Sequence, residues 1–232
     1  MSDMNDLDES TRSFYFKHIE DGIIDRCEQE LQSYKQISLT SDGCPKDEKA
    51  RRGFDIQTMW GLYADKGKGI CLVFNKERLL AVFNKLPGIK KSGYVNYSND
   101  YDSAIEFMSD SPEEEIGQRL DEIFFCKSNL WQNEQEYRLI IKHTGSACSL
   151  DISECIEGII FATLGAKIDE NPNNTKSYYL LERVCSGIRI FGYNHRSLNG
   201  NRTLYRVYDG KEVWSTGEII DILSGEWNVA IM

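Results

Sequence analysis

The stretch ICLVF, residues 70–74, is an unbroken run of apolar side chains that follows the polar turn ADKGKG at residues 64–69. A short apolar run bounded by turn residues is typical of a strand that is buried on both faces. We therefore predict that residues 70–74 form a central strand of a sheet.

Further strands are predicted on either side of this run. Residues 36–40 form a short extended segment upstream, and Tyr94, Val95 and Tyr97 indicate another strand downstream. In the second half, β-branched and aromatic residues gather at residues 137–142, 158–163, 187–191 and 203–208. Asp209-Gly210 is a hairpin signal that joins residues 203–208 to residues 211–214.

Helical periodicity separates these strands. Apolar residues at positions 19, 23, 27, 31 and 34 predict an amphipathic helix over residues 12–35. Ser111-Pro112-Glu113-Glu114 is a capping box with proline at the first helical position. Further helices are predicted near residues 59–63, 178–185 and 215–225.

The order of elements predicts an α+β fold, a single domain in which a mixed, mainly antiparallel sheet is packed with helices. Within it we expect an acidic N-terminal segment and amphipathic helix at residues 1–35, a core at residues 36–214, and a C-terminal helix and tail at residues 215–232.

Composition excludes several classes of protein. The 232 residues are 41% hydrophobic and carry a formal net charge of -10, which fits a folded globular chain. Nucleic-acid binding draws on clustered Lys and Arg, so a nucleic-acid partner is not expected. The short basic clusters at residues 49–52 and 90–91 are interpreted as solvated loop charge.

The seven cysteines are odd in number, and no two of them have the C-x-x-C spacing of a zinc site, so no metal is expected. The N-terminus lacks a hydrophobic signal segment, and no apolar run approaches the ~18 residues that span a bilayer. We therefore expect a cytoplasmic protein with free thiols and no membrane contact. Cys71 is expected to be inert core, and Cys44, in a polar loop, to be the most reactive thiol.

Two common catalytic patterns are absent from the sequence. The segment GLYADKGKG has five residues between Gly61 and Gly67, one more than a phosphate-binding P-loop, and Gly69 replaces its hydroxyl residue. The three histidines are scattered, and none has a Ser or Cys partner that the sequence places nearby.

The segment WQNEQEYRLII, residues 131–141, carries a pair of glutamates with one residue between them. If residues 134–141 are extended, Glu134, Glu136 and Arg138 share one face, and the two carboxylates lie about 6 to 7 Å apart. One carboxylate could then stabilise positive charge while the other orients or deprotonates a nucleophile. Alternatively, Glu136 and Arg138 form an ordinary surface ion pair. A cation, a hydroxyl and an aromatic ring precede the pair, at Lys127, Ser128 and Trp131.

Three blocks of sequence resemble a known family. They are MWGLYADKGKGICLVF at residues 59–74, KSNLWQNEQEYRLI at residues 127–140 and IEGIIFATLGAKI at residues 156–168. Together, in this order, they are similar to the signature blocks of the bacterial family called domain of unknown function 2971. The resemblance covers about residues 36–208 and implies no established activity.

A weaker similarity connects the chain to ADP-ribosyltransferases, whose sites combine an Arg or His strand, a Ser-Thr-Ser strand and a Glu-x-Glu at a strand start. SLTS at residues 38–41 resembles the second part, and Glu134-x-Glu136 the third. This resemblance implies NAD as a substrate, with Glu136 stabilising the oxocarbenium-like transition state, Glu134 positioning the acceptor, and Ser38 or Ser41 supporting the site. The expected phosphate-binding Arg or His strand is missing, because residues 1–34 are acidic and helical.

Two hypotheses follow. The first is an NAD-using ADP-ribosyltransferase or NAD glycohydrolase, with a cleft that holds Trp60, Tyr63, Lys127, Ser128 and both glutamates, and with Trp131 and Arg138 nearby. The second is a non-catalytic module that binds a partner in a stress or phage-defence system. Trp60 and Tyr63 are more often core residues than ligand stackers, and a test for a pocket would separate the two hypotheses. The expected binding partner is therefore either a small nucleotide or a protein.

Overall fold

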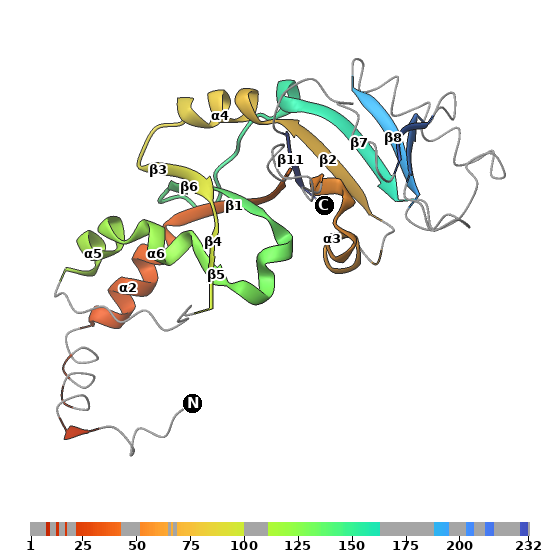
Figure 1. Ribbon diagram of the computed structural model, residues 1–232. Coiled ribbons are helices and arrows are strands. Elements are labelled where there is room, and N and C mark those ends of the chain that lie inside the picture. The colour runs from red at the N-terminus through yellow and green to blue at the C-terminus, as the bar shows by residue number, and fades with distance from the viewer. Residues whose placement is uncertain are drawn as a thin grey trace. The chain divides into compact units, whose positions relative to one another are not determined.

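A computed structural model of the chain (Figure 1) describes residues 8, 9, 13, 17, 22–42, 52–64, 66, 69–99, 111–162, 188–194, 203–206, 212–215 and 228–231. The chain divides into two compact units. Unit 1 comprises Met1–Ile37, Gly88–Asn129 and Leu139–Cys148, and unit 2 comprises Ser38–Pro87, Leu130–Arg138 and Ser149–Met232. Its helices and mixed, mainly antiparallel strands confirm the α+β class.

In unit 2, the apolar run at residues 70–74 forms strand β2 (Ile70–Asn75). It lies between β7 (Ile156–Ala162) and β11 (Asn228–Ile231) and is antiparallel to both. Figure 1 shows β2, β7 and β8 side by side. The prediction of a central strand is therefore confirmed, whereas β11 was not predicted.

The remaining strands of unit 2 extend the sheet away from β2. Beyond β7 lie β8 (Arg189–Asn194), which is parallel to β7, and then β9 (Thr203–Arg206) and β10 (Glu212–Ser215), each antiparallel to its neighbour. On the other side, β11 is antiparallel to the end of β1 (Tyr34–Ser41), with Thr40 opposite Ala230. The pairing of β9 with β10 confirms the predicted hairpin partners, although the turn itself lies outside the described residues.

One apolar core supports this sheet. It gathers buried side chains from η2 (Gly53–Asp55), from α3 (Gln57–Leu62) and the turn after it, and from the strands. They are Phe54, Trp60, Ala64, Cys71, Val73, Ile160, Phe191 and Tyr193. Within β2, Cys71 and Val73 are fully buried, but Ile70 is 40% exposed. The expectation that both faces are buried is thus wrong at the start of the strand, because antiparallel neighbours can leave part of a face to solvent.

Helix α4 (Lys76–Lys85) follows β2 directly in unit 2. The Asn75 side chain caps it by accepting a hydrogen bond from the Arg78 backbone N–H at 3.0 Å. Leu79 and Phe83, four residues apart, are the buried residues of this helix. The short helix η5 (Ser153–Cys155) precedes β7.

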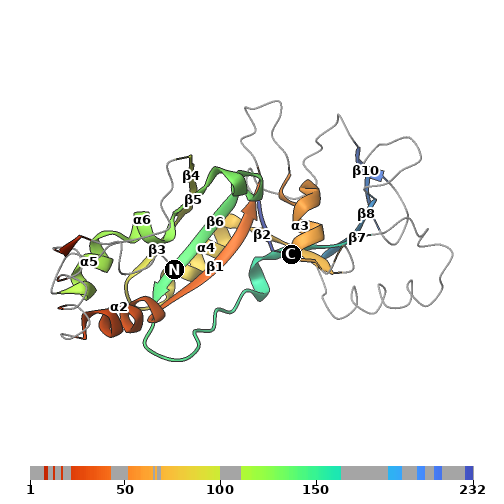
Figure 2. The same ribbon diagram turned by 90° about the horizontal axis from the view of Figure 1, so that it is seen from below.

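Unit 1 is built on helix α2 (Ile23–Gln32) and on α5 (Pro112–Gln118) and α6 (Leu120–Phe124). Figure 2 shows α2 beside α5, where Arg26 and Glu113 form an ion pair of 2.8 Å. The helix expected over residues 12–35 ends at Gln32, because β1 begins two residues later. Most of its first half lies outside the described residues.

The helix predicted from the capping box divides at Arg119, whose φ of -105° and ψ of 22° interrupt the helical backbone. Ser111 is the N-cap residue, but its side chain makes no capping hydrogen bond. The predicted N-cap position is therefore confirmed, but the Ser111 side chain does not form its bond of the capping box. Beneath these helices, a core of buried residues collects Tyr34, Ile116, Leu120, Phe125 and Ile140.

Short strands complete unit 1. They are β3 (Lys90–Tyr94) and the parallel pair β4 (Asn96–Ser98) and β5 (Cys126–Ser128). Strand β6 (Glu136–Lys142) contributes residues to both units, as does β1. Helices expected at residues 178–185 and 215–225 lie outside the described residues, as does Cys44. Over the described part of the chain, no helix is long and apolar enough to cross a membrane.

Candidate functional site

The two glutamates lie on different elements of unit 2. Glu134 is the last residue of the short helix η4 (Asn129–Glu134), and Glu136 is the first residue of β6. Gln135 between them has a φ of 49°, in the left-handed region that non-glycine residues adopt at a cost of about 1 to 2 kcal/mol. The expectation that Glu134 belongs to the strand, on one face with Glu136, is therefore wrong.

Arg138 holds Glu136 through both carboxylate oxygens. Its Nε donates to Glu136 Oε2 at 2.6 Å, and its Nη2 donates to Glu136 Oε1 at 3.1 Å. The two side chains share one face because they lie two residues apart on β6. They are only 12% and 8% exposed. The predicted ion pair is thus confirmed in its partners but wrong in its exposure, and a buried pair is costly to break.

The buried side chain of Glu134 is hydrogen-bonded to the half-exposed Tyr63. The side chain is buried, at 4% exposure, while Tyr63 is 51% exposed at the end of α3. The Tyr63 hydroxyl donates a hydrogen bond of 2.8 Å to Glu134 Oε1. A ligand that meets the exposed part of the Tyr63 ring would therefore lie close to this carboxylate. The prediction that Tyr63 is core is wrong, because its ring stands outside the apolar cluster.

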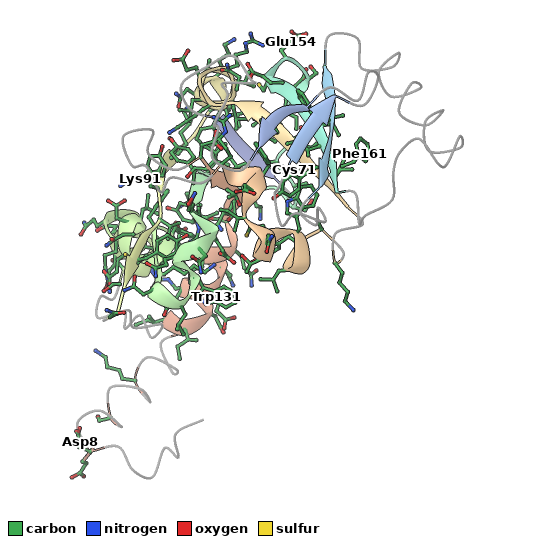
Figure 3. All side chains as sticks on the ribbon, turned by 45° about the vertical axis from the view of Figure 1, so that its right-hand side comes forward. Asp8, Cys71, Lys91, Trp131, Glu154 and Phe161 are labelled. Atoms are coloured by element: carbon green, nitrogen blue, oxygen red, sulfur yellow. The ribbon has the colours of Figure 1, made fainter. Side chains whose placement is uncertain are left out.

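Trp131 lies on the same side of η4 as Glu134. Side chains three residues apart in a 3₁₀-helix eclipse each other, at a rise of about 2 Å per residue. Trp131 is 44% exposed, and its neighbour Leu130 is 87% exposed. Figure 3 shows Trp131 on this element. The exposed ring of Trp131 and the buried Glu134 carboxylate thus share one side of η4, and the Tyr63 phenol contacts that carboxylate.

Ser41 supports the backbone between the two acids. Its N–H and its Oγ both donate to the Gln135 carbonyl oxygen, at 2.9 Å and 2.8 Å, and the Gln135 amide donates to the Ser41 carbonyl oxygen at 3.0 Å. Ser41 is buried, whereas Ser38, earlier on the same strand, is exposed. Of the two serines proposed to support the site, Ser41 contacts the Glu-x-Glu segment, and the supporting role of Ser38 stays a prediction.

Trp60 is a core residue. It is 3% exposed, and its ring stacks on Tyr193 with a centroid distance of 5.9 Å and an interplanar angle of 21°. Its Nε1 donates a hydrogen bond of 2.6 Å to the Phe54 carbonyl oxygen. The structural interpretation of Trp60 is confirmed. The expected contact with a ligand stays a prediction that this packing does not favour.

Lys127 and Ser128, the other two candidates, lie on β5 in unit 1 and are half-buried. Within unit 1, β5 pairs with β4, and Lys127 lies opposite Tyr97. Their predicted role beside the glutamates stays a prediction.

Sequence reasoning missed two contacts and one backbone feature of unit 2. Lys76 lies over the ring of Tyr137, 4.1 Å from its centroid, and the buried carboxylate of Asp55 accepts a hydrogen bond from the Tyr193 hydroxyl. The left-handed backbone of Gln135 was not predicted, because a glutamine before a strand gives no sequence signal for a positive φ. The sequence drew attention to this segment only through the two glutamates that flank Gln135. The described residues contain no group of three or more His, Cys, Asp or Glu side chains placed to hold a metal ion.

Comparison with known proteins identifies one family. Residues 59–139 match the family described as protein of unknown function (DUF2971). This range contains Tyr63, Trp131, both glutamates and Arg138, so the family resemblance drawn from the sequence is confirmed over the segment that carries the site. The ADP-ribosyltransferase resemblance stays a prediction. No match was found among curated proteins or among solved structures.

Proposed function

We propose that this chain, which matches the DUF2971 family over residues 59–139, is an enzyme that uses NAD, cleaving the bond between nicotinamide and ribose and passing the ADP-ribose to water or to an acceptor. The contact between Glu134 and Tyr63 carries the proposal. It joins a buried carboxylate to a half-exposed aromatic ring, with the exposed Trp131 on the same side of η4. Buried carboxylates that meet a ligand surface are suited to stabilising positive charge.

The reaction needs such a group. When the bond between ribose C1′ and the ring nitrogen breaks, its electron pair goes to that nitrogen, and nicotinamide leaves as a neutral molecule. The ribose becomes oxocarbenium-like, and a nearby carboxylate stabilises its charge. Water or an acceptor hydroxyl then bonds to C1′ and gives its proton to the carboxylate.

The geometry favours Glu134 for this central role, which the sequence resemblance assigned to Glu136. Both oxygens of Glu136 accept hydrogen bonds from Arg138, so this pair is better suited to fixing the start of β6. The phenol of Tyr63 orients the Glu134 carboxylate. Trp131 offers a ring on which a planar cation such as the pyridinium of NAD can stack.

A second candidate is a non-catalytic module that binds a protein partner. It is favoured by the exposed apolar side chains of Leu62, Leu130 and Trp131 in unit 2, which are 62%, 87% and 44% exposed. Exposed apolar groups that gather near one another mark interaction sites. In this case the Glu134–Tyr63 contact organises a docking surface and has no chemical role.

The test follows released nicotinamide by chromatography in a cell extract that supplies acceptors. Wild type is compared with Glu134→Gln, which removes the charge but keeps the shape and an oxygen that accepts from Tyr63. Glu154→Gln is the matched control, because Glu154 is an exposed glutamate of unit 2 that Figure 3 shows well away from Trp131. We expect turnover in wild type and Glu154→Gln, and its loss in Glu134→Gln.

No nicotinamide release by folded wild type under any condition would overturn the enzyme proposal. The second candidate then has its own test. Leu130→Asp should abolish retention of a partner protein by the immobilised chain without lowering the melting temperature, because this side chain is already in solvent. Equal retention by wild type and Leu130→Asp would contradict docking at this surface.

A further inference from the structure

The backbone between Glu134 and Glu136 changes from a 3₁₀-helix to a strand at a single residue, Gln135. In an extended segment, residues 134 and 136 would point to the same face. The left-handed φ of 49° at Gln135 instead ends helix η4 and starts strand β6. As a result, the Glu134 carboxylate meets Tyr63, while the Glu136 carboxylate meets Arg138.

Hydrogen bonds with Ser41 hold this left-handed residue. The Gln135 carbonyl oxygen accepts from both the N–H and the Oγ of Ser41, at 2.9 Å and 2.8 Å. The Gln135 side-chain amide returns to the Ser41 carbonyl oxygen at 3.0 Å. Backbone and side chain of both residues therefore take part, which fixes the peptide plane as well as the position of the turn.

The anchor itself is rigidly placed. Ser41 is the last residue of β1, is 5% exposed and lies opposite Val229 of β11 in an antiparallel pair. Gln135 is tied on its other side, because its N–H donates to the Gln132 carbonyl oxygen within η4 at 3.3 Å. The turn is thus fixed to the sheet at one end and to the helix at the other.

We propose that Ser41 and Gln135 are positioning residues whose mutual hydrogen bonds hold the Glu134 carboxylate against Tyr63. This clamp places an acid at the end of η4, in contact with the half-exposed Tyr63. The consequence for turnover rests on the proposed function, whereas the consequence for the Glu134–Tyr63 contact does not.

Four variants separate the parts of the clamp. Ser41→Ala removes the hydroxyl donor and keeps the backbone bond, and Gln135→Ala removes the side-chain amide. Gln135→Gly also removes the amide but adopts a positive φ readily, so its comparison with Gln135→Ala isolates the backbone contribution. Ser153→Ala is the control, because it removes another serine hydroxyl bond of unit 2, the 2.7 Å contact with Asp151.

The first readout is the NMR signal of the Tyr63 ring carbon that bears the hydroxyl, in protein labelled at that carbon in its tyrosines. The signal that disappears in Tyr63→Phe belongs to Tyr63, and Glu134→Ala gives its shift without the carboxylate contact. In the double variant Ser41→Ala/Gln135→Ala we expect this signal to move most of the way to the Glu134→Ala value. Gln135→Gly should move it less than Gln135→Ala, and Ser153→Ala should leave it in place.

The second readout is nicotinamide release. In the double variant we expect kcat to fall on the order of 100-fold while KM changes by less than about twofold, as for a displaced acid. An unmoved Tyr63 signal in the folded double variant, or in both single variants, would overturn the inference whatever the activity. A moved signal with no turnover in wild type would support the clamp and contradict the enzyme proposal instead.

Discussion

Arg138 reaches back two residues along β6 and binds both carboxylate oxygens of Glu136, in a pair that is almost wholly buried. An exposed pair of this kind contributes about 0 to 1 kcal/mol to stability. A buried pair behaves differently, because removal of one partner leaves the other charge in a poorly solvated place. The same two residues thus have a different energetic role from the one that their sequence spacing suggested.

Glu136→Gln is expected to lower the free energy of unfolding by about 3 kcal/mol, because it leaves the Arg138 guanidinium buried without its anionic partner. Urea unfolding measures this loss. The double variant Glu136→Leu/Arg138→Met should recover much of it, since it removes both charges. A loss below about 1 kcal/mol for the single variant would show that the pair is effectively solvated.

Tyr63→Phe tests the contact that the proposed function depends on. The change removes one hydrogen bond to a carboxylate, which is expected to cost about 1 kcal/mol because the tyrosine is half-exposed. A double-mutant cycle with Glu134→Ala, which removes the acceptor oxygens, measures the coupling energy between the two side chains. Strict additivity of the two single variants would contradict the hydrogen bond.

Trp60→Ala is expected to cost about 3 to 5 kcal/mol of unfolding free energy. The reason is its burial at 3% exposure, together with its stack on Tyr193 and its hydrogen bond to the Phe54 carbonyl. Trp131→Ala is the comparison, because Trp131 is 44% exposed and should cost far less. Similar losses for both tryptophans in urea unfolding would contradict this distinction.

The sequence predicted the strands well because their pattern is local. Residues 70–74 are apolar enough to require a place inside a sheet, and β2 lies between two neighbours as expected. Strand β11 escaped prediction because residues 228–231 are too few for a periodic pattern, and they become a strand through pairing with β2 and β1. Long-range pairing of this kind cannot be predicted from the local strand propensity of the residues.

The candidate site was predicted in its residues but not in its geometry. The pair of glutamates marked the correct turn, and Tyr63 was named as a candidate. Their contact joins positions 71 residues apart, which spacing within one segment cannot reveal. Gln135, whose backbone is left-handed, is hydrogen-bonded to Ser41, 94 residues away in the chain. This long-range contact is not visible in the local sequence. Side-chain alternation along a strand therefore led to the incorrect expectation that Glu134 and Glu136 share one face.

The buried thiol of Cys71 should resist alkylation. It is 0% exposed, and burial raises its pKa far above the ordinary range for a thiol, so almost no reactive thiolate forms near neutral pH. Cys126 and Cys148 are partly exposed and should react first among the described cysteines. Iodoacetamide labelling of folded protein followed by peptide mass spectrometry measures the order. Labelling of Cys71 as fast as Cys126 would contradict the packing of β2.

The ion pair between Lys142 and Glu30 in unit 1 predicts a loss of stability at alkaline pH. Lys142 Nζ donates to both Glu30 oxygens, at 2.6 Å and 2.8 Å, and this bond raises the Lys142 pKa. Burial, followed by the charge of Glu30, raises the pKa of Tyr34, whose ring centroid is 5.9 Å from Lys142 Nζ. Both groups hold their protons more tightly in the folded chain than in the unfolded one.

A raised pKa in the folded state gives stability that is complete below the unfolded pKa and is lost as the pH rises through the folded pKa. For Lys142 and Tyr34 this loss begins near about pH 10, the ordinary range of both groups. Glu30→Gln should lower the free energy of unfolding by about 2 kcal/mol at pH 8. It should also reduce the further loss between pH 8 and pH 11, because the variant no longer holds the Lys142 proton. Guanidinium unfolding at the two pH values measures both effects, and an equal alkaline loss in wild type and Glu30→Gln would contradict this linkage.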